Sequence, residues 1–242
     1  MSAVTASDSA ISTARAPLLP SSLARAALVE EVLDSLVEEL GREGNEEEVA
    51  AARGRYDRRR GRVFEDEALW EEWTRAFLEW YIVERIHPIS KRPLVARSMA
   101  AEADPMRAVV MRALITSLRS LFEIRAVRKE EVELGDILGG AHFSVSAEPL
   151  HGVSPGDVAE LRLIGFDHEV FFGRTFLFHP GGTREAILAH ARRIAAEGGK
   201  REEVIDYCAS LRIRCERYRH VSPIRVYEAA TADFPQWRIA GK

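Results

Sequence analysis

Cysteine is scarce in this sequence. Its 242 residues include two, Cys208 and Cys215, which lie seven positions apart on one predicted helix. Two helical turns separate such residues by roughly 10 Å, which is too far for a disulfide between them. The sequence contains no C-x-x-C pair of the kind that binds zinc. These features predict reduced thiols in a cytoplasmic protein, with no metal and no cofactor.

Long apolar runs are also missing. The sequence has no stretch of 18 apolar residues, so neither a membrane-spanning helix nor a membrane partner is expected. Residues 1–21 lack the basic start and the continuous apolar core of a secretory signal, and their composition predicts a disordered tail. APLLP, residues 16–20, is the one apolar cluster in that tail. It is a candidate docking peptide, although an inert tail is the simpler interpretation.

Familiar catalytic and phosphate-binding motifs are missing as well. In VELGDILGGAHFSV, residues 132–145, Gly135 and Gly140 have the spacing of a Walker loop, but Ala141 and His142 follow where Lys and Ser or Thr are needed. A strand is expected next, whereas a phosphate loop continues into a helix. The sequence has no G-x-S-x-G or H-E-x-x-H motif. An unrecognised hydrolase is the third functional hypothesis, and it depends on the histidines of the β region: His142, His151, His168 and His179.

Apolar residues at three- and four-residue spacing predict helices over much of the chain. The expected helices cover residues 22–42, 45–62, 66–86, a short segment within 92–103, 105–120, 183–197 and 200–219. Three of the four tryptophans lie on one stripe of the helix at 66–86, which is typical of a core-facing surface. Asp104 is placed to cap the helix that starts at Pro105.

Between residues 121 and 180 the hydrophobic period changes from 3.6 to two, which is typical of strands. About five short antiparallel strands with tight turns predict a small β-barrel or a strongly bent sheet. The predicted fold class is therefore α+β, with helices before and after the strands. The expected divisions are a disordered tail (1–21), a helical region (22–120), the small barrel (121–180), a C-terminal helical pair (181–220) and a peripheral tail (221–242).

Glycines and aspartates mark the predicted turns of the β region. Glycine supplies backbone conformations that other residues avoid, and aspartate accepts hydrogen bonds from nearby amides. We therefore interpret six residues as structural: Gly135, Asp136, Gly139, Gly140, Gly156 and Asp157. The strand positions expected to face outward carry mixed charges, which is unfavourable for nucleic acid: Glu123, Glu131, Glu133 and Glu160 against Arg125 and Arg162.

Several runs occur in an order that resembles a known group of proteins. They are FLEWYIVER, RPLV, ALITSLRSLFEIRAV, VELGDILGGAHFSVSAE, VSPGDVAELRL and FFGRTFLFHP, between residues 77 and 180. This pattern resembles the helix-plus-small-barrel core of uncharacterised bacterial proteins, some of which carry a SEC-C metal-binding motif. The corner at residues 136–139 and the later Gly156, Asp157 and Arg162 match the group. The SEC-C cysteines are absent, so the resemblance implies a fold core and a bacterial origin without a metal or an activity.

The helix at 45–62 begins with acids and ends with arginines, an order that suits the helix dipole. Its arginines are candidate contacts to a partner or to phosphates: Arg53, Arg55, Arg58, Arg59, Arg60 and Arg62. A net charge of -4 and a pI near 6 argue against nucleic acid bound over the whole surface.

A non-enzymatic protein–protein interaction module, such as an adaptor, a regulator or an assembly subunit, is the main functional hypothesis. The apolar stripes at 22–42 and 200–219 have the spacing to pair with a protein partner or with a second copy in a homo-oligomer. Nucleic-acid binding through arginine-rich helix ends is the alternative.

Overall fold

The computed structural model describes residues 22–42, 44–147, 150 and 152–230. Its elements, in chain order, are α1 (Ser22–Leu40), α2 (Glu46–Arg60), α3 (Trp70–Val83), α4 (Leu94–Met99), α5 (Pro105–Ile115), β1 (Leu118–Val127), β2 (Glu131–Asp136), β3 (His142–Ser146), β4 (Val158–Phe166), β5 (Glu169–Phe178), α6 (Arg184–Ala196), α7 (Arg201–Arg217) and α8 (Pro223–Ala229). The predicted tail at 1–21 and residues 231–242 lie outside the described residues.

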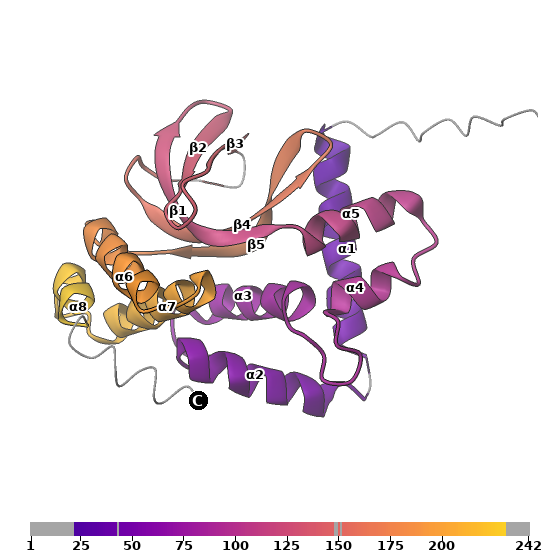
Figure 1. Ribbon diagram of the computed structural model, residues 1–242, viewed down its shortest axis with the longest axis horizontal. Coiled ribbons are helices and arrows are strands. Elements are labelled where there is room, and N and C mark those ends of the chain that lie inside the picture. The colour runs from indigo at the N-terminus through magenta and orange to yellow at the C-terminus, as the bar shows by residue number, and fades with distance from the viewer. Residues whose placement is uncertain (1–21, 43, 148–149, 151, 231–242) are drawn as a thin grey trace, which may run out of the picture.

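The fold is α+β, as the sequence predicts, with helices before and after a five-stranded antiparallel sheet of order β3-β2-β1-β4-β5. The sheet is strongly bent and is not closed into a barrel, so the bent sheet is correct and the small barrel is not. Figure 1 shows α3 beneath the sheet, with α2 on the other side of α3. Helices α1, α4 and α5 lie at one end of the molecule, and α6, α7 and α8 lie at the other.

The bend is accompanied by two irregularities in strand pairing. The register of β1 against β2 shifts between Ile124 and Ala126, and that of β4 against β5 shifts between Leu161 and Leu163. Such shifts bend a strand and increase its local twist. The concave face of the sheet is filled by its own apolar side chains, including the fully buried Phe122.

Local signals mark most of the helices that the sequence predicts, but the helix expected at 105–120 ends at Ile115, and residues 118–120 begin β1. Asp104 caps α5, because its Oδ1 accepts hydrogen bonds from the backbone N–H groups of Met106 at 2.8 Å and of Arg107 at 3.4 Å. In α3, Trp73 is fully buried and packs edge-on against Tyr56 of α2. The tryptophan stripe is therefore part of the core, as predicted, and α2 covers it.

The corner between β2 and β3 is held by Asp136, as predicted. Its buried Oδ1 accepts hydrogen bonds from Ser120 Oγ at 2.5 Å and from the Leu138 N–H at 3.0 Å, and its Oδ2 pairs with Arg201 at 3.1 Å. The Gly140 N–H donates to the backbone carbonyl of Asp136 at 2.8 Å. The two ends of the turn are thus tied through one residue, which connects the sheet to the start of α7.

The glycines of the β region have two different roles. Gly140 and Gly156 have positive φ values of 76° and 94°, which glycine adopts without strain. Gly135 and Gly139 do not have positive φ values. A Cβ on Gly135 would lie 2.3 Å from Arg125 Nε, and one on Gly139 would lie 2.4 Å from the Asp136 carboxylate. At Gly139 glycine leaves space for the fixed Asp136 carboxylate, whereas at Gly135 the half-exposed Arg125 side chain would have to move.

We expect Asp136→Ala to lower the free energy of unfolding by about 2 kcal/mol, because it leaves a buried hydroxyl and a backbone N–H without their acceptor. Urea unfolding measures this change. Asp136→Asn keeps an acceptor at the same place and should lose less. A fully stable Asp136→Ala protein that had lost a specific binding partner would show instead that Asp136 belongs to a binding site.

The sequence prediction that Glu160 faces solvent is wrong. The Glu160 side chain on β4 is fully buried, and Arg162 on the same strand is almost fully buried. The reason is that β4 is an interior strand of the sheet, between β1 and β5, and its other face lies against helices. On this strand, the alternation of apolar and charged residues therefore reflects a buried layer of ion pairs and not a face exposed to solvent.

The segment expected to be a peripheral tail from residue 221 includes the short helix α8. Its Tyr227 is fully buried, and the ring hydroxyl lies 2.7 Å from His179 Nδ1. His190 Nε2 on α6 lies 2.8 Å from the Tyr227 carbonyl oxygen. Helix α8 thus joins the end of β5 to α6.

Candidate functional site

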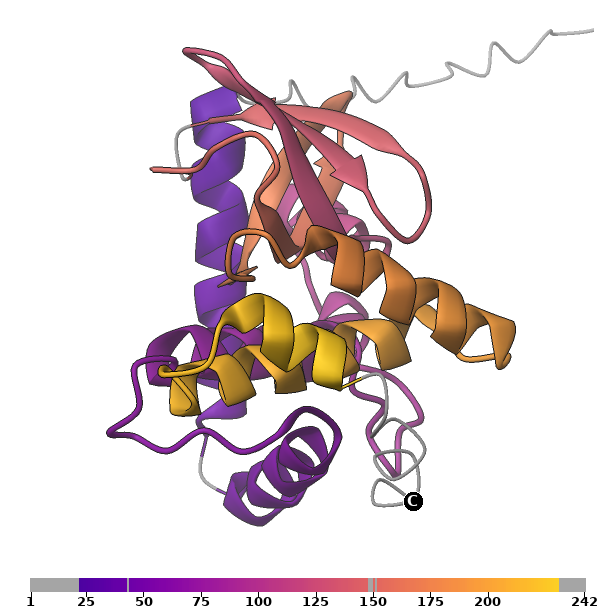
Figure 2. The same ribbon diagram turned by 90° about the vertical axis from the view of Figure 1, so that its left-hand side faces the viewer.

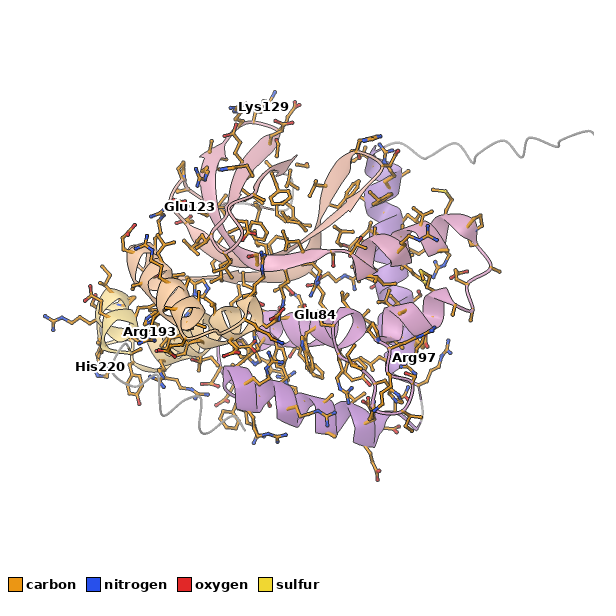
Figure 3. The ribbon with its side chains drawn as sticks, in the orientation of Figure 1. Glu84, Arg97, Glu123, Lys129, Arg193 and His220 are labelled. Carbon is orange, nitrogen blue, oxygen red and sulfur yellow. The ribbon has the colours of Figure 1, made fainter. Side chains whose placement is uncertain are left out.

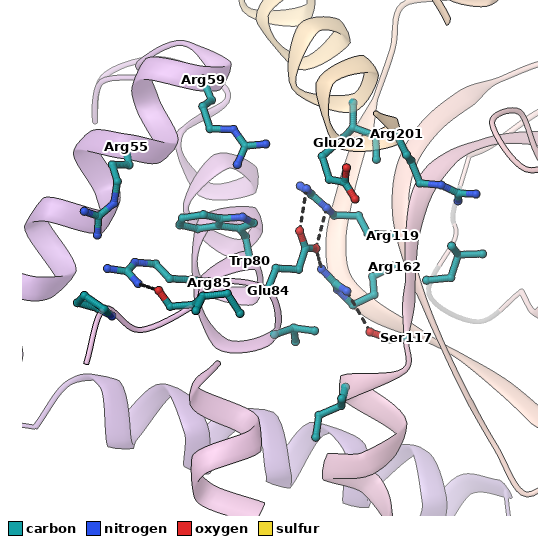
Figure 4. Close-up of a pocket in the computed structure, with 16 residues that line it drawn as sticks. Arg55, Arg59, Trp80, Glu84, Arg85, Ser117, Arg119, Arg162, Arg201 and Glu202 are labelled. Carbon is teal, nitrogen blue, oxygen red and sulfur yellow. Dashed lines mark hydrogen bonds and ion pairs between the residues drawn. The ribbon is translucent and has the colours of Figure 1, made fainter. Parts of the chain in front are cut away.

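A cleft of about 700 Å³ opens between α2, the end of α3, the start of α7 and the sheet. Figure 4 shows it with arginines entering from both sides. Its charged lining consists of six arginines and two glutamates: Arg55, Arg59, Glu84, Arg85, Arg119, Arg162, Arg201 and Glu202. These residues come from four separate elements and from the segment after α3, so only folding brings them together.

Glu84, the residue that follows α3 (labelled in Figure 3), organises the sheet side of the cleft. Figure 4 shows its side chain directed toward Arg119 and Arg162 of the sheet. Its Oε1 lies 2.9 Å from Arg119 Nε on β1, and its Oε2 accepts a hydrogen bond from Arg119 Nη2 at 3.0 Å. Arg162 on β4 also pairs with Glu84 and donates to Ser117 Oγ at 3.0 Å. One carboxylate therefore holds two arginines side by side.

A second, fully buried group of charges lies behind this wall. Arg60 at the end of α2 forms a two-pronged pair with Glu160, with distances of 3.1 and 2.6 Å. Arg60 also reaches Asp206 of α7 at 3.2 Å, and Arg119 reaches Glu160 at 3.1 Å. These bonds join α2, the sheet and α7 through side chains that have almost no contact with solvent.

The buried Glu160 and the partly exposed Glu84 are both held in the charged form. Burial alone raises the pKa of Glu160, but Arg60 and Arg119 outweigh it and hold the pKa below its usual range. Burial likewise opposes ionisation of Glu84, and Arg119 with Arg162 brings its pKa below the usual range. At neutral pH neither group carries a proton that it could donate to a substrate, so neither is suited to general acid catalysis.

On the opposite wall of the cleft, the positive charges of the arginines are less completely neutralised by carboxylates. Arg55 on α2 is exposed and has no ion-pair partner among the residues that the structure describes. Arg59 pairs with Asp206 at 2.5 Å but remains about two-fifths exposed. Burial lowers the pKa of Arg85; its partner Glu48 opposes this, while the nearby Arg55 and Arg97 lower it further. An anion placed in the cleft would relieve this repulsion.

This arrangement can bind an anionic group. Guanidinium groups match the geometry of carboxylates and phosphates through paired N–H donors, and such charge-assisted bonds are strong for their size. The described lining contains no histidine, cysteine or lysine that could act as a nucleophile or base. Over the described residues, no group of three or more His, Cys, Asp or Glu side chains is arranged to hold a metal ion.

The structure separates the six arginines that the sequence selected, five of which lie on α2 while Arg62 follows it. Arg55 and Arg59 line the cleft. Arg53 pairs with Asp57 at 3.1 Å and lies over the Phe77 ring. The remaining three point elsewhere: Arg58 is exposed outside the cleft, Arg60 is buried and Arg62 lies over Phe64.

Sequence reasoning missed the cleft residues that lie outside α2. Glu84 and Arg85 end the run FLEWYIVER, where they look like ordinary helix-end charges. Arg119 and Arg162 lie in strands and look like solvent-facing positions. The available signal was the presence of acids and arginines inside otherwise apolar runs, such as Glu160 and Arg162 in VAELRL. Such charges are rarely buried unless they are paired.

The histidines named for a hydrolase do not share one site in the described part of the chain. His168 lies in the turn before β5 and His179 lies just after it. The two therefore lie at opposite ends of the ten-residue strand β5. His142 begins β3 and is exposed, and His151 lies outside the described residues.

Both cysteines are buried and free, as expected for small apolar residues of a core. Burial raises the pKa of the Cys208 thiol well above its ordinary value, and that of Cys215 to about 11. Neither thiol is therefore ionised at neutral pH, which makes both poor nucleophiles.

Comparisons with known proteins add no relative. No family model matches the sequence, and searches among curated proteins and among solved structures find no match. Among the described residues, no helix is both long and apolar enough to cross a membrane.

Proposed function

We propose that the protein is a non-enzymatic interaction module of the cytoplasm, and that its arginine-lined cleft receives an acidic side chain of a partner protein. The observation that carries this proposal is the wall formed by Arg55, Arg59 and Arg85. There an exposed arginine without an ion-pair partner in the described chain faces a buried arginine whose pKa is lowered. On the sheet side of the cleft, Glu84 neutralises Arg119 and Arg162 and holds them in place.

Several features favour an acidic protein segment over nucleic acid. A volume of about 700 Å³ accommodates a few side chains, whereas nucleic acid usually follows an extended basic track. Trp80 lines the cleft but is only 8% exposed, so it offers little surface for stacking against a base. The exposed Glu202 at the mouth would repel a continuous phosphate backbone.

The apolar stripes considered for partner binding are largely used inside the chain. In α1, Val29, Val32 and Leu36 are buried in the core. In α7, most of the residues between Val204 and Cys215 are buried. These helix faces are therefore not available to a second copy, and the proposed partner contact shifts to the charged cleft.

We expect Arg55→Glu to weaken the binding of a fluorescein-labelled oligoglutamate peptide about tenfold. A tenfold change in the dissociation constant corresponds to the binding free energy of roughly one charge-assisted hydrogen bond. Fluorescence anisotropy at low salt measures the dissociation constant. Arg58→Glu makes the same charge change on the same helix, outside the cleft, and should leave the constant almost unchanged.

Two results would contradict the proposal. Equal weakening by Arg55→Glu and Arg58→Glu would mean that only the net charge matters. Tighter binding of single-stranded oligothymidylate than of oligoglutamate, with a steep dependence on salt, would favour the nucleic-acid alternative. Affinity purification with the two variants then identifies the partner as a protein that Arg58→Glu retains and Arg55→Glu loses.

A further inference from the structure

A second hollow lies on another part of the molecule, between the start of α1 and strands β3 and β5. It has a volume of about 1460 Å³. It exists because the sheet does not close: β3 and β5 are the two edge strands, and each is hydrogen-bonded to one neighbour. Figure 1 and Figure 2 both show the first turns of α1 beside this open side of the sheet.

The floor of this groove is apolar. Val170, Phe172 and Phe176 of β5 line it together with Val145 of β3. Phe172 and Val145 are buried members of the cluster that fills the concave face of the sheet, whereas Val170 and Phe176 are only partly buried. The core of the sheet is therefore incompletely covered here, and an apolar occupant would complete it.

The chain enters this groove at the beginning of α1. Arg25 forms ion pairs with both Asp167 and Glu169, which fix the first turn of α1 against the β4–β5 turn. Leu23 lines the groove and is 74% exposed, which is unusual for a leucine beside other apolar side chains. The described part of the chain therefore begins at the wall of the groove.

We propose that the segment Pro17–Leu18–Leu19–Pro20 of this same chain docks in the groove, with Leu18 and Leu19 covering the partly buried Val170 and Phe176 of β5. The two leucines precede Leu23 by five and four positions, a reach of roughly 15 Å in extended chain. Proline favours an extended backbone, which suits a groove that runs beside strand edges. The four residues carry no charge, as an apolar floor requires.

A cross-linking experiment in the full-length chain tests this docking. Leu19→Cys is combined with Ser144→Cys, an exposed position of β3 that lines the groove, and the protein is oxidised with diamide. Native Cys208 and Cys215 are buried with raised thiol pKa values, so they do not compete. We expect an intramolecular disulfide, detected by non-reducing electrophoresis and peptide mass spectrometry.

The matched control separates docking from mere tethering. Adding Leu18→Asp leaves both cysteines and the chain length unchanged but places a charge against the apolar floor. Docking predicts that the cross-linking rate falls about tenfold or more, since burying one leucine side chain is worth at least that factor. An unchanged rate, or no disulfide at all, overturns the proposal. A disulfide formed only between molecules shows that a second copy occupies the groove.

The outcome is independent of the proposed function. The arginine-lined cleft and this groove share no lining residue, so loss of oligoglutamate binding and loss of the disulfide report on different surfaces.

Discussion

Glu160→Gln should lower the free energy of unfolding by about 3 to 5 kcal/mol, the usual cost of removing one partner from a buried ion pair. The substitution keeps the shape of the side chain, so it creates no cavity. It leaves Arg60 and Arg119 fully buried with one carboxylate fewer between them. Each guanidinium group keeps one other carboxylate, Glu84 for Arg119 and Asp206 for Arg60, but Glu84 is shared with Arg162 and Asp206 with Arg59.

Urea unfolding followed by circular dichroism measures this loss. The matched control is Glu71→Gln, which removes one partner of an exposed pair with Arg75 on α3. Exposed pairs contribute little, so this variant should lose less than about 0.5 kcal/mol. Similar losses for the two variants would show that the buried layer is not the electrostatic centre of the fold. A large loss that Arg60→Met restores would confirm that the unneutralised cation is its cause.

The helices were predictable because their signals are local. The cap at Asp104 and the stripe that contains Trp73 each depend on residues within a few positions of one another. The two-residue turn at Asp167 and His168, which have φ values of 51° and 65°, is likewise encoded in the short sequence GFDHE. For these elements, short-range periodicity and turn chemistry are sufficient.

The buried ionic layer was not predictable in the same way. Arg60 and Glu160 are one hundred positions apart, and their contact depends on α2, the sheet and α7 packing together. A charged residue in a strand usually faces solvent, so local patterning gives the wrong face for Glu160. The same limit applies to the cleft. The sequence selected Arg55 and Arg59 as part of an arginine run, but their partners in the site come from distant segments.

The unclosed sheet is another property that local patterning leaves open. Alternating strands indicate a bent antiparallel sheet, but closure depends on whether β3 and β5 pair. Helix α1 is fixed by Arg25 beside that gap, and this leaves the groove exposed. The apolar cluster at residues 16–20 acquires a candidate binding site only when the gap is known.

Acidification should destabilise the protein already between pH 6.5 and about 4, because of His179. Burial lowers the pKa of this histidine from 6.5 to about 4 in the folded chain. Between these two values the unfolded chain binds a proton that the folded chain does not bind, so lowering the pH favours unfolding. The stability contribution is complete above pH 6.5 and is lost as the pH falls toward 4. A shift of this size corresponds to about 3 kcal/mol.

The surroundings of His179 explain the direction of this shift. The imidazole is 5% exposed, and its Nε2 has no hydrogen-bond partner in the described part of the chain. Glu160 favours the charged form, but Arg212 and Arg60 oppose it, and burial is the largest effect. Its Nδ1 is hydrogen-bonded to the hydroxyl of Tyr227, which a neutral ring can share.

Unfolding free energies measured at intervals from pH 7 to pH 5 test this prediction with two variants. His179→Asn retains a polar atom near Tyr227 and removes the titrating ring, so its stability should vary much less with pH over this interval. His168→Asn is the control, because His168 is exposed in a left-handed turn conformation that asparagine tolerates. His190, whose pKa is also lowered by burial, is present in both variants, so its contribution to the pH dependence of the unfolding free energy is common to them. If His168→Asn flattened the curve as much as His179→Asn, the acid sensitivity would not arise in the buried contact between β5 and α8.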